Sequence, residues 1–139
     1  VVVSMDVRSD ARGGWDVYAE GGRVPAKRKA LDWAKEAERL GAGELLVQSI
    51  DRDGAGLGYD LDLMRGVAEA VRIPVIALGG VGDWPHLAEA LGRTGVSAVA
   101  AANVFAHMEN SVYHAKKYLF DRGFNVRSPS LYEFHESGA

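Results

Sequence analysis

The chain has 139 residues, a formal charge of −3, 47% hydrophobic residues and 25% charged residues, a composition that is typical of a globular domain and gives no sign of a nucleic-acid partner. It contains no cysteine, which excludes disulfides and thiolate chemistry and is consistent with the reducing cytoplasm. No apolar run approaches the roughly 18 residues of a membrane-spanning helix, so we expect no membrane partner.

The first predicted unit is a strand over residues 1–7, a loop over 8–27 and a helix over 28–40 that ends at Gly41. Apolar residues alternate from Trp15 onward, which predicts a small hairpin within the loop. The chain opens on three valines without an initiator methionine. A start inside a strand suggests a fragment or a processed chain.

The second predicted unit is a strand over 44–49, a loop with several glycines over 50–60 and a helix over 61–71. Asp60 precedes this helix as its expected N-cap, because a carboxylate there accepts from the unpaired amides of the first turn. Apolar residues recur at helical spacing and predict one buried face. The residues of that face are Leu61, Met64, Val67, Ala68 and Val71.

The third predicted unit is a strand over 74–78, a glycine turn over 79–82 and a helix over 84–93. Asp83 is the expected cap of this helix, and a proline stands in its first turn, where a missing amide costs nothing. The strand is apolar throughout, as is the next one along the chain. Such strands are expected when both faces of a sheet are covered.

The fourth predicted unit is a strand over 98–102, a short turn at 103–104 and a helix over 111–122. Beyond it, residues 128–139 are predicted to form a C-terminal tail, and we assign them no function. Four successive strand–helix units predict parallel strands joined by right-handed crossovers. The predicted fold class is therefore α/β, of the type in which parallel strands surround a barrel interior.

Ligands gather at the carboxyl ends of the strands in parallel βα folds, so the residues that follow each strand are the candidates for a site. The turns after the third and fourth strands together predict a phosphate site, because small residues let exposed backbone amides approach an anion. The alternative is a tight turn that needs glycine for its conformation alone. The candidate phosphate-binding residues are Gly79, Gly80, Gly82, Ala102 and Asn103.

Carboxylates follow the first two strands. Asp6 lies at the end of an apolar strand, where a charge costs desolvation energy unless it is paired or used, and it is the candidate acid–base residue. The alternative for Asp6 is a loop cap that bonds backbone amides. Asp51, Asp53 and Gly54 predict a mobile active-site loop with an internal charge network around Arg52, or alternatively an exposed turn that satisfies its own charges.

Glu44 opens the second strand at its opposite, amino end, where a single glutamate is more often a solvated charge. The four histidines share no ligand spacing, and the chain has no cysteine to add to them. We therefore expect neither a metal site nor a cofactor. The histidines are His86, His107, His114 and His135.

Four motifs, in this order and spacing, resemble the second half of the cyclase subunit of imidazole glycerol phosphate synthase: VVVSMDV, LGAGELLVQSIDRDGAGLGYD, IPVIALGGVG and VSAVAAANVF. The resemblance implies that residues 1–127 form the C-terminal half of a (β/α)8 TIM barrel, strands five to eight. It also implies a lyase of histidine biosynthesis. Such an enzyme closes an imidazole ring with ammonia from a glutaminase subunit, giving imidazole glycerol phosphate and an aminoimidazole ribotide.

The resemblance implies roles for single residues as well. Asp6 corresponds to the fifth-strand aspartate, one of two that act as general acid and base, while its first-strand partner is absent from this sequence. Asp53 and Gly54 fall on the active-site loop, and Glu44 on a charged gate that admits ammonia at the bottom of the barrel. One phosphate of a bisphosphate substrate would be held by Gly79, Gly80, Ala102 and Asn103.

Three residues depart from the family pattern, because Gln48, Leu78 and Asn103 stand where Thr, Ser and Ser are usual. The first loop is altered too, with Arg-Val-Pro-Ala over 23–26 in place of a basic residue followed by Asn-Thr-Gly. The altered pocket brings forward a paralogue as the alternative. That paralogue would pass ammonia to a nucleotide-sugar pathway for surface polysaccharide.

Four βα units leave two unpaired strand edges and an exposed barrel interior, a state that soluble proteins avoid. We therefore expect an N-terminal half-barrel as partner and an inactive chain in its absence. The alternative is a second copy of the chain, with which it would form a non-enzymatic, phosphate-binding barrel.

Overall fold

Six strands form one mixed sheet in the order β3-β2-β1-β4-β5-β6 in the computed structural model, which describes residues 1–107 and 112–129. Strands β1, β4, β5 and β6 are parallel, whereas β2 and β3 are antiparallel to their neighbours. Their bounds are β1 (Val2–Ser9), β2 (Trp15–Ala19), β3 (Val24–Lys29), β4 (Glu44–Ser49), β5 (Val75–Leu78) and β6 (Ala98–Val99). The predicted α/β class is confirmed.

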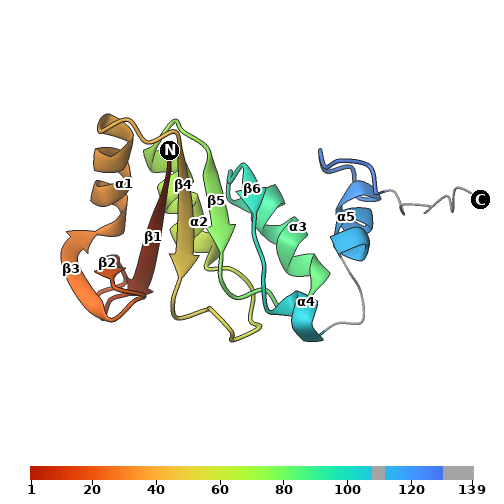
Figure 1. Ribbon diagram of the computed structural model, residues 1–139, viewed down its shortest axis with the longest axis horizontal. Coiled ribbons are helices and arrows are strands. Elements are labelled where there is room, and N and C mark those ends of the chain that lie inside the picture. Colours follow the sequence, from red (N-terminus) through yellow and green to blue (C-terminus); the bar gives the residue numbers. More distant parts are fainter. Residues whose placement is uncertain (108–111, 130–139) are drawn as a thin grey trace, which may run out of the picture.

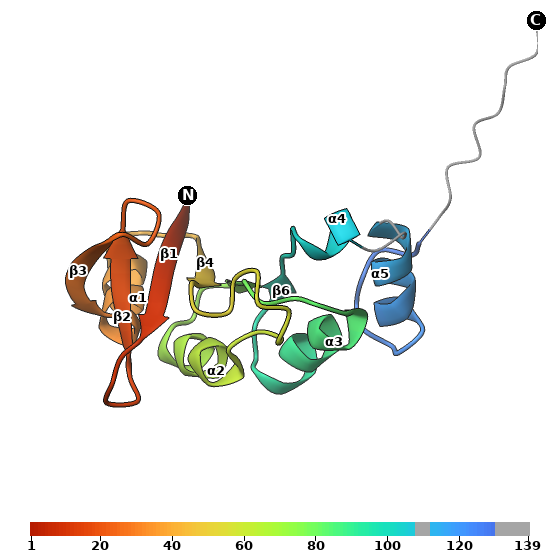
Figure 2. The ribbon, with the colours of Figure 1, turned by 90° about the horizontal axis from the view of Figure 1, so that it is seen from below.

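Five helices lie in the described part of the chain: α1 lies beside β2 and β3, α2 beside β5, and α3 beside β6 (Figures 1 and 2). Each parallel strand is followed by a crossover to the next, as in consecutive units of a (β/α) barrel. No helix in the described residues is long and apolar enough to cross a bilayer. The helices are α1 (Ala30–Arg39), α2 (Leu61–Ala70), α3 (Trp84–Arg93), α4 (Val104–His107) and α5 (Val112–Phe120).

One face of the sheet is buried under helices α1 and α2. Alternate side chains of β1, β4 and β5 point to this face, and they pack with buried residues of the two helices. The strand contribution is Met5, Val7, Leu45, Val47, Val75 and Ala77, and the helix contribution is Ala30, Ala34, Ala37, Leu63, Met64 and Val67. Leu63 is fully buried but was missing from the predicted buried face of α2. The prediction began that face at Leu61, which is only half-buried in the structure.

The other face of the sheet is open. Along β4 the residues alternate between buried and half-buried, and the half-buried ones face the side that α1 and α2 do not cover. The strand register aligns Asp6 with Gln48 and Gln48 with Leu78. These three side chains therefore form one row on the open face, in the carboxyl-terminal halves of three neighbouring strands.

The first loop differs most from its prediction. Strand β1 continues to Ser9, and the predicted hairpin extends the sheet, since Asp6 pairs with Tyr18 across β1 and β2. Helix α1 begins at Ala30 and not at Arg28, because residues 24–29 belong to β3. The first strand was expected to be an unpaired edge of the sheet, and this expectation is wrong for the carboxyl half of β1, which pairs with β2.

A cluster of charges closes this hairpin. Lys29 on β3 forms ion pairs with Asp10 and Asp16. The hydrogen bond from Lys29, aided by the backbone amides of Gly14 and Arg12, lowers the pKa of Asp10 to about 2. The cluster ties the end of β3 to the start of the hairpin.

The caps were predicted correctly. Asp60 accepts from the amide of Leu63 at 3.0 Å, and Asp83 accepts from the amide of Trp84 at 2.7 Å. Strand β6 is shorter than predicted, and the separate helix α4 follows the turn at 103. Residue 111, most of the predicted tail (130–139) and His135 lie outside the described residues.

Candidate functional site

The carboxyl ends of β1, β4 and β5 point the same way, and the loops that follow β4 and β5 meet there together with α4 (Figure 1). This edge of the sheet is called the rim below. Asp6, Gln48 and Leu78 are all half-buried in their common row at the rim. Asp6 lies in the middle of the extended β1, so the alternative of a loop cap is wrong.

The loop after β4 is anchored to β1 at its second residue, Asp51. The carboxylate of Asp51 accepts from the amide and the hydroxyl of Ser9, both at 2.7 Å, and lies 3.4 Å from Nε of Arg8. The Arg8 guanidinium also stacks over the ring of Tyr18, 4.9 Å from its centroid. Asp51 thus joins the loop to the hairpin side of the sheet.

The second carboxylate of the loop is held from β4. Gln48 Nε2 donates to Asp53 Oδ2 at 3.0 Å, and the amide of Asp53 donates to the carbonyl of Ser49 at 3.0 Å. Arg52 donates instead to the carbonyl of Leu57 at 3.3 Å. The expected internal charge network is therefore wrong, since both carboxylates bind partners on the strands.

The glycines of the turn after β5 are required by packing against the same loop. A Cβ added to Gly80 would lie 2.2 Å from the carbonyl oxygen of Gly58, and Gly80 has a φ of +105°. A Cβ on Gly82 would lie 2.3 Å from the carbonyl oxygen of Gly56. The amide of Gly58 donates to the carbonyl of Gly80 at 2.7 Å. Close backbone contact is thus a sufficient reason for these glycines without any ligand.

The amide of Gly82 has a partner that the sequence did not reveal. It donates to Nδ1 of His86 at 3.1 Å, and the ring of His86 also lies against Gly58. Gly82 is therefore not a free donor for an anion, contrary to its predicted role. The four-residue spacing was visible in the sequence, but only the turn geometry brings the ring back onto the amide.

The other predicted phosphate residues do come together. Gly79, Gly80, Ala102 and Asn103 line one small cavity at the rim, and Asp53 and Gly54 from the loop after β4 close its other side. Within the described residues, the backbone hydrogen bonds of the turns provide no acceptor for the amides of Gly80 and Asn103. The cavity holds about 20 Å³, which is room for a water molecule and not for a phosphate group.

Tyr59 joins this region to β6. Its buried hydroxyl donates to the carbonyl of Ala100 at 2.8 Å, and burial raises its pKa. The hydroxyl therefore stays protonated and remains a donor over the physiological range. It fixes the end of the loop after β4 to the strand that leads into the turn at 102–103.

Glu44 lies at the amino end of β4, on the same open face as Asp6. The register pairs Glu44 with Val2 and Gln48 with Asp6, so four residues, or about 13 Å along the strand, separate the two carboxylates. Glu44 is half-buried. The structure thus places these two predicted residues at opposite ends of one face.

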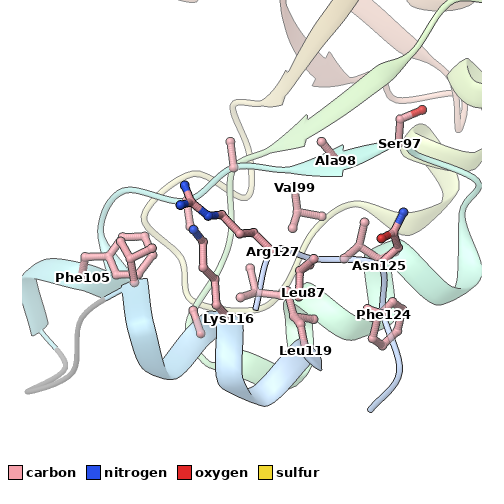
Figure 3. Close-up of a pocket in the computed structure, with 16 residues that line it drawn as sticks. Leu87, Ser97, Ala98, Val99, Phe105, Lys116, Leu119, Phe124, Asn125 and Arg127 are labelled. Carbon is pink, nitrogen blue, oxygen red and sulfur yellow. The ribbon is translucent and has the colours of Figure 1, made fainter. Parts of the chain in front are cut away.

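A larger pocket of about 730 Å³ lies on the far side of β6, between α3, α5 and residues 124–127. Figure 3 shows Leu87, Leu119 and Phe124 in its mainly apolar wall, and it shows Lys116 and Arg127 extending along one side of it. No predicted catalytic or phosphate-binding residue lines this pocket. The described residues contain no group of three or more His, Asp or Glu that could hold a metal ion.

Two comparisons with known proteins bear on the site. The model of the histidine biosynthesis protein family matches residues 1–111. Subunit HisF of imidazole glycerol phosphate synthase from Gluconacetobacter diazotrophicus is 46% identical over 127 residues, which cover 91% of this chain and 49% of the relative. The chain thus spans about half the length of the curated relative it matches.

Proposed function

Because the chain belongs to the histidine biosynthesis protein family, as its motifs predicted, we propose that residues 1–127 are the C-terminal four βα units of a (β/α)8 barrel with cyclase activity. In the completed barrel, ammonia closes an imidazole ring and the substrate is cleaved to imidazole glycerol phosphate and an aminoimidazole ribotide. Residues 128–139 are not assigned to the barrel. The enzyme is a cytoplasmic lyase of histidine biosynthesis.

The observation that carries this proposal is the position of Asp6. Its carboxylate lies on the open face of the sheet at the rim, where the ligands of βα barrels bind. A carboxylate at this place can take a proton from the incoming ammonia nitrogen or give one to a leaving group as the ring closes. A second acid–base residue would come from the half of the barrel that this chain lacks.

The glycine turn supplies the binding end of the site. Gly80 and Asn103 line one cavity, and their amides can donate to a phosphate of the substrate without a basic side chain. Gly79 and Ala102 allow the close approach. Calorimetry with inorganic phosphate, or a crystal soaked with it, tests this assignment, and a phosphate bound elsewhere would overturn it.

Ammonia would enter from a glutaminase subunit at the opposite end of the barrel. Glu44 lies there on the same open face as Asp6, and we infer that ammonia passes between the two carboxylates along the barrel interior. The free outer edge of β6 and the apolar pocket beside it support an N-terminal half-barrel as the partner that covers this side. Gel filtration of the chain with and without that half tests the pairing. A stable dimer of the chain alone would favour the self-assembled, non-enzymatic barrel.

Ammonia-dependent turnover of the completed barrel tests the role of Asp6. We expect Asp6→Asn, which keeps the shape and removes the ionisable group, to lower kcat at least about 100-fold, the scale of a lost general acid or base. Asp16→Asn, on the neighbouring strand and outside the rim row, is the matched control and retains turnover. Near wild-type turnover by Asp6→Asn would exclude the proposed mechanism.

One observation favours a second candidate function. Gln48 and Leu78 lie next to Asp6 in the rim row, and the side chain of Gln48 donates a hydrogen bond to Asp53. The polar side chains that are usual in the family beside the proposed reacting carboxylate are therefore changed. A paralogue that delivers ammonia to a nucleotide-sugar pathway is the alternative. Complementation of a histidine auxotroph by the full-length protein distinguishes the two, because only the first function restores growth.

A further inference from the structure

Asp53 is a wall residue of the cavity that we assign to phosphate. Asp53 and Gly54 line this cavity together with Gly79, Gly80 and Asn103, and the remaining space admits only about one water molecule. A phosphate therefore cannot enter while the loop keeps this position. A negative charge in the same small cavity would also oppose the binding of an anion.

Gln48 is what holds Asp53 there. Its amide nitrogen donates to the Asp53 carboxylate at 3.0 Å, from a strand whose position is fixed by the core. A threonine at position 48, as is usual in the family, has a shorter side chain and would not reach the carboxylate from the same backbone position. The hydrogen bond to Asp53 therefore depends on one of the three departures from the family pattern.

Neighbouring contacts separate the movable part of the loop from its fixed ends. Asp51 is anchored to Ser9 on one side, and Tyr59 is anchored to Ala100 on the other. Between them, Gly54 lies against the amide group of Asn103, since a Cβ added to it would approach Nδ2 at 3.6 Å. No hydrogen bond joins Gly54 to Asn103 in the described residues, so opening of the Asp53–Gly54 segment breaks the bonds of Asp53 to Gln48 and Ser49 and can leave both ends in place.

We propose that Asp53, held by Gln48, is an internal occupant of the anion site, and that a phosphorylated ligand binds by displacing it. This inference rests on the proposed phosphate site at the glycine turn. Gln48 is a positioning residue that acts through Asp53. The hydrogen bond between them lowers the affinity of the site for anions and makes opening of the loop part of binding.

The experiment is titration calorimetry of the full-length protein with inorganic phosphate at fixed ionic strength, because screening changes with salt. Asp53→Asn removes the charge and retains the side-chain shape, and we expect it to tighten phosphate binding about tenfold. Gln48→Ala removes the tether alone and should tighten binding about threefold. Asp62→Asn on α2 makes the same charge change at an exposed site away from the rim, and it should alter binding less than about twofold.

Two further measurements make the result specific. The double variant Gln48→Ala/Asp53→Asn should bind no more tightly than Asp53→Asn, because the tether then has no charge to hold. In hydrogen exchange, saturating phosphate should accelerate exchange of the Asp53 amide, which donates to Ser49 in the closed loop. A tether of purely structural importance would change stability and leave this ligand-dependent exchange unaltered.

The outcomes separate the inference from the function beneath it. One outcome is that phosphate shifts the NMR resonances of the Gly80 and Asn103 amides while Asp53→Asn binds phosphate within twofold of the wild-type affinity, or more weakly. That result would support the proposed phosphate site and exclude Asp53 as its internal occupant. Slower exchange of the Asp53 amide with phosphate bound would exclude it too. If neither wild type nor Asp53→Asn binds phosphate at these amides, the proposed phosphate site is wrong and the inference ends with it.

Discussion

Replacement of Gly80 by alanine tests whether the glycine turn is set by packing. The new Cβ would lie 2.2 Å from the carbonyl oxygen of Gly58, and 2.9 Å from Cβ of Arg52, neither of which is the free end of a flexible side chain. The positive φ of +105° adds about 1–2 kcal/mol for a residue with a side chain. Overpacking adds about 1–3 kcal/mol, so Gly80→Ala should destabilise the protein by about 2–5 kcal/mol.

The assay is urea denaturation of the full-length protein without ligand. Gly92→Ala is the matched control, because Gly92 lies in α3 and its added Cβ would meet Phe124 at an ordinary 3.6 Å. There the gain in helix propensity predicts a stabilisation of about 0.5–1 kcal/mol. A free energy of unfolding for Gly80→Ala within about 0.5 kcal/mol of wild type would refute the packing argument and leave ligand binding as the reason for this glycine.

Two other contacts give predictions for stability. Tyr59→Phe removes the buried hydrogen bond to Ala100 and should lower the free energy of unfolding by about 1–2 kcal/mol; an unchanged urea midpoint would show that the bond contributes nothing. Asp10 has its pKa lowered to about 2 from an ordinary 3.8, so its contribution is present above pH 4 and is lost as the pH falls towards 2. Lys29→Met should therefore weaken the loss of stability between about pH 4 and pH 2, measured as urea midpoints, and an unchanged pH profile would contradict the assignment.

The parts of the fold that the sequence predicted well depend on local signals. Asp60 and Asp83 were identified as caps because a carboxylate before a helix serves the amides of its own first turn. The strand over 44–49 was predicted with its observed bounds, because its core-facing residues alternate with the rest. The hairpin was recognised by its alternation, but its pairing with β1 was missed, since that pairing depends on which edge of the sheet is free.

The parts of the site that were missed depend on contacts between distant segments. A side chain at position 80 would clash with the backbone of Gly58, on the preceding loop, and no pattern within the glycine turn indicates this contact. Asp51 and Asp53 were expected to pair with Arg52 between them, yet successive residues of a turn point in different directions, and both carboxylates found partners on strands. The sequence therefore located the rim residues but not their partners.

The register of the sheet also limits the ligand. Asp6 on β1 and Leu78 on β5 belong to one row with Gln48 between them, so two strand spacings, or about 10 Å, separate the carboxylate from the strand that leads into the glycine turn. A phosphate at the turn and a reacting group at Asp6 must then belong to a molecule that extends over roughly that distance. The proposed site therefore favours an elongated ligand that extends from the glycine turn after β5 to Asp6 on β1.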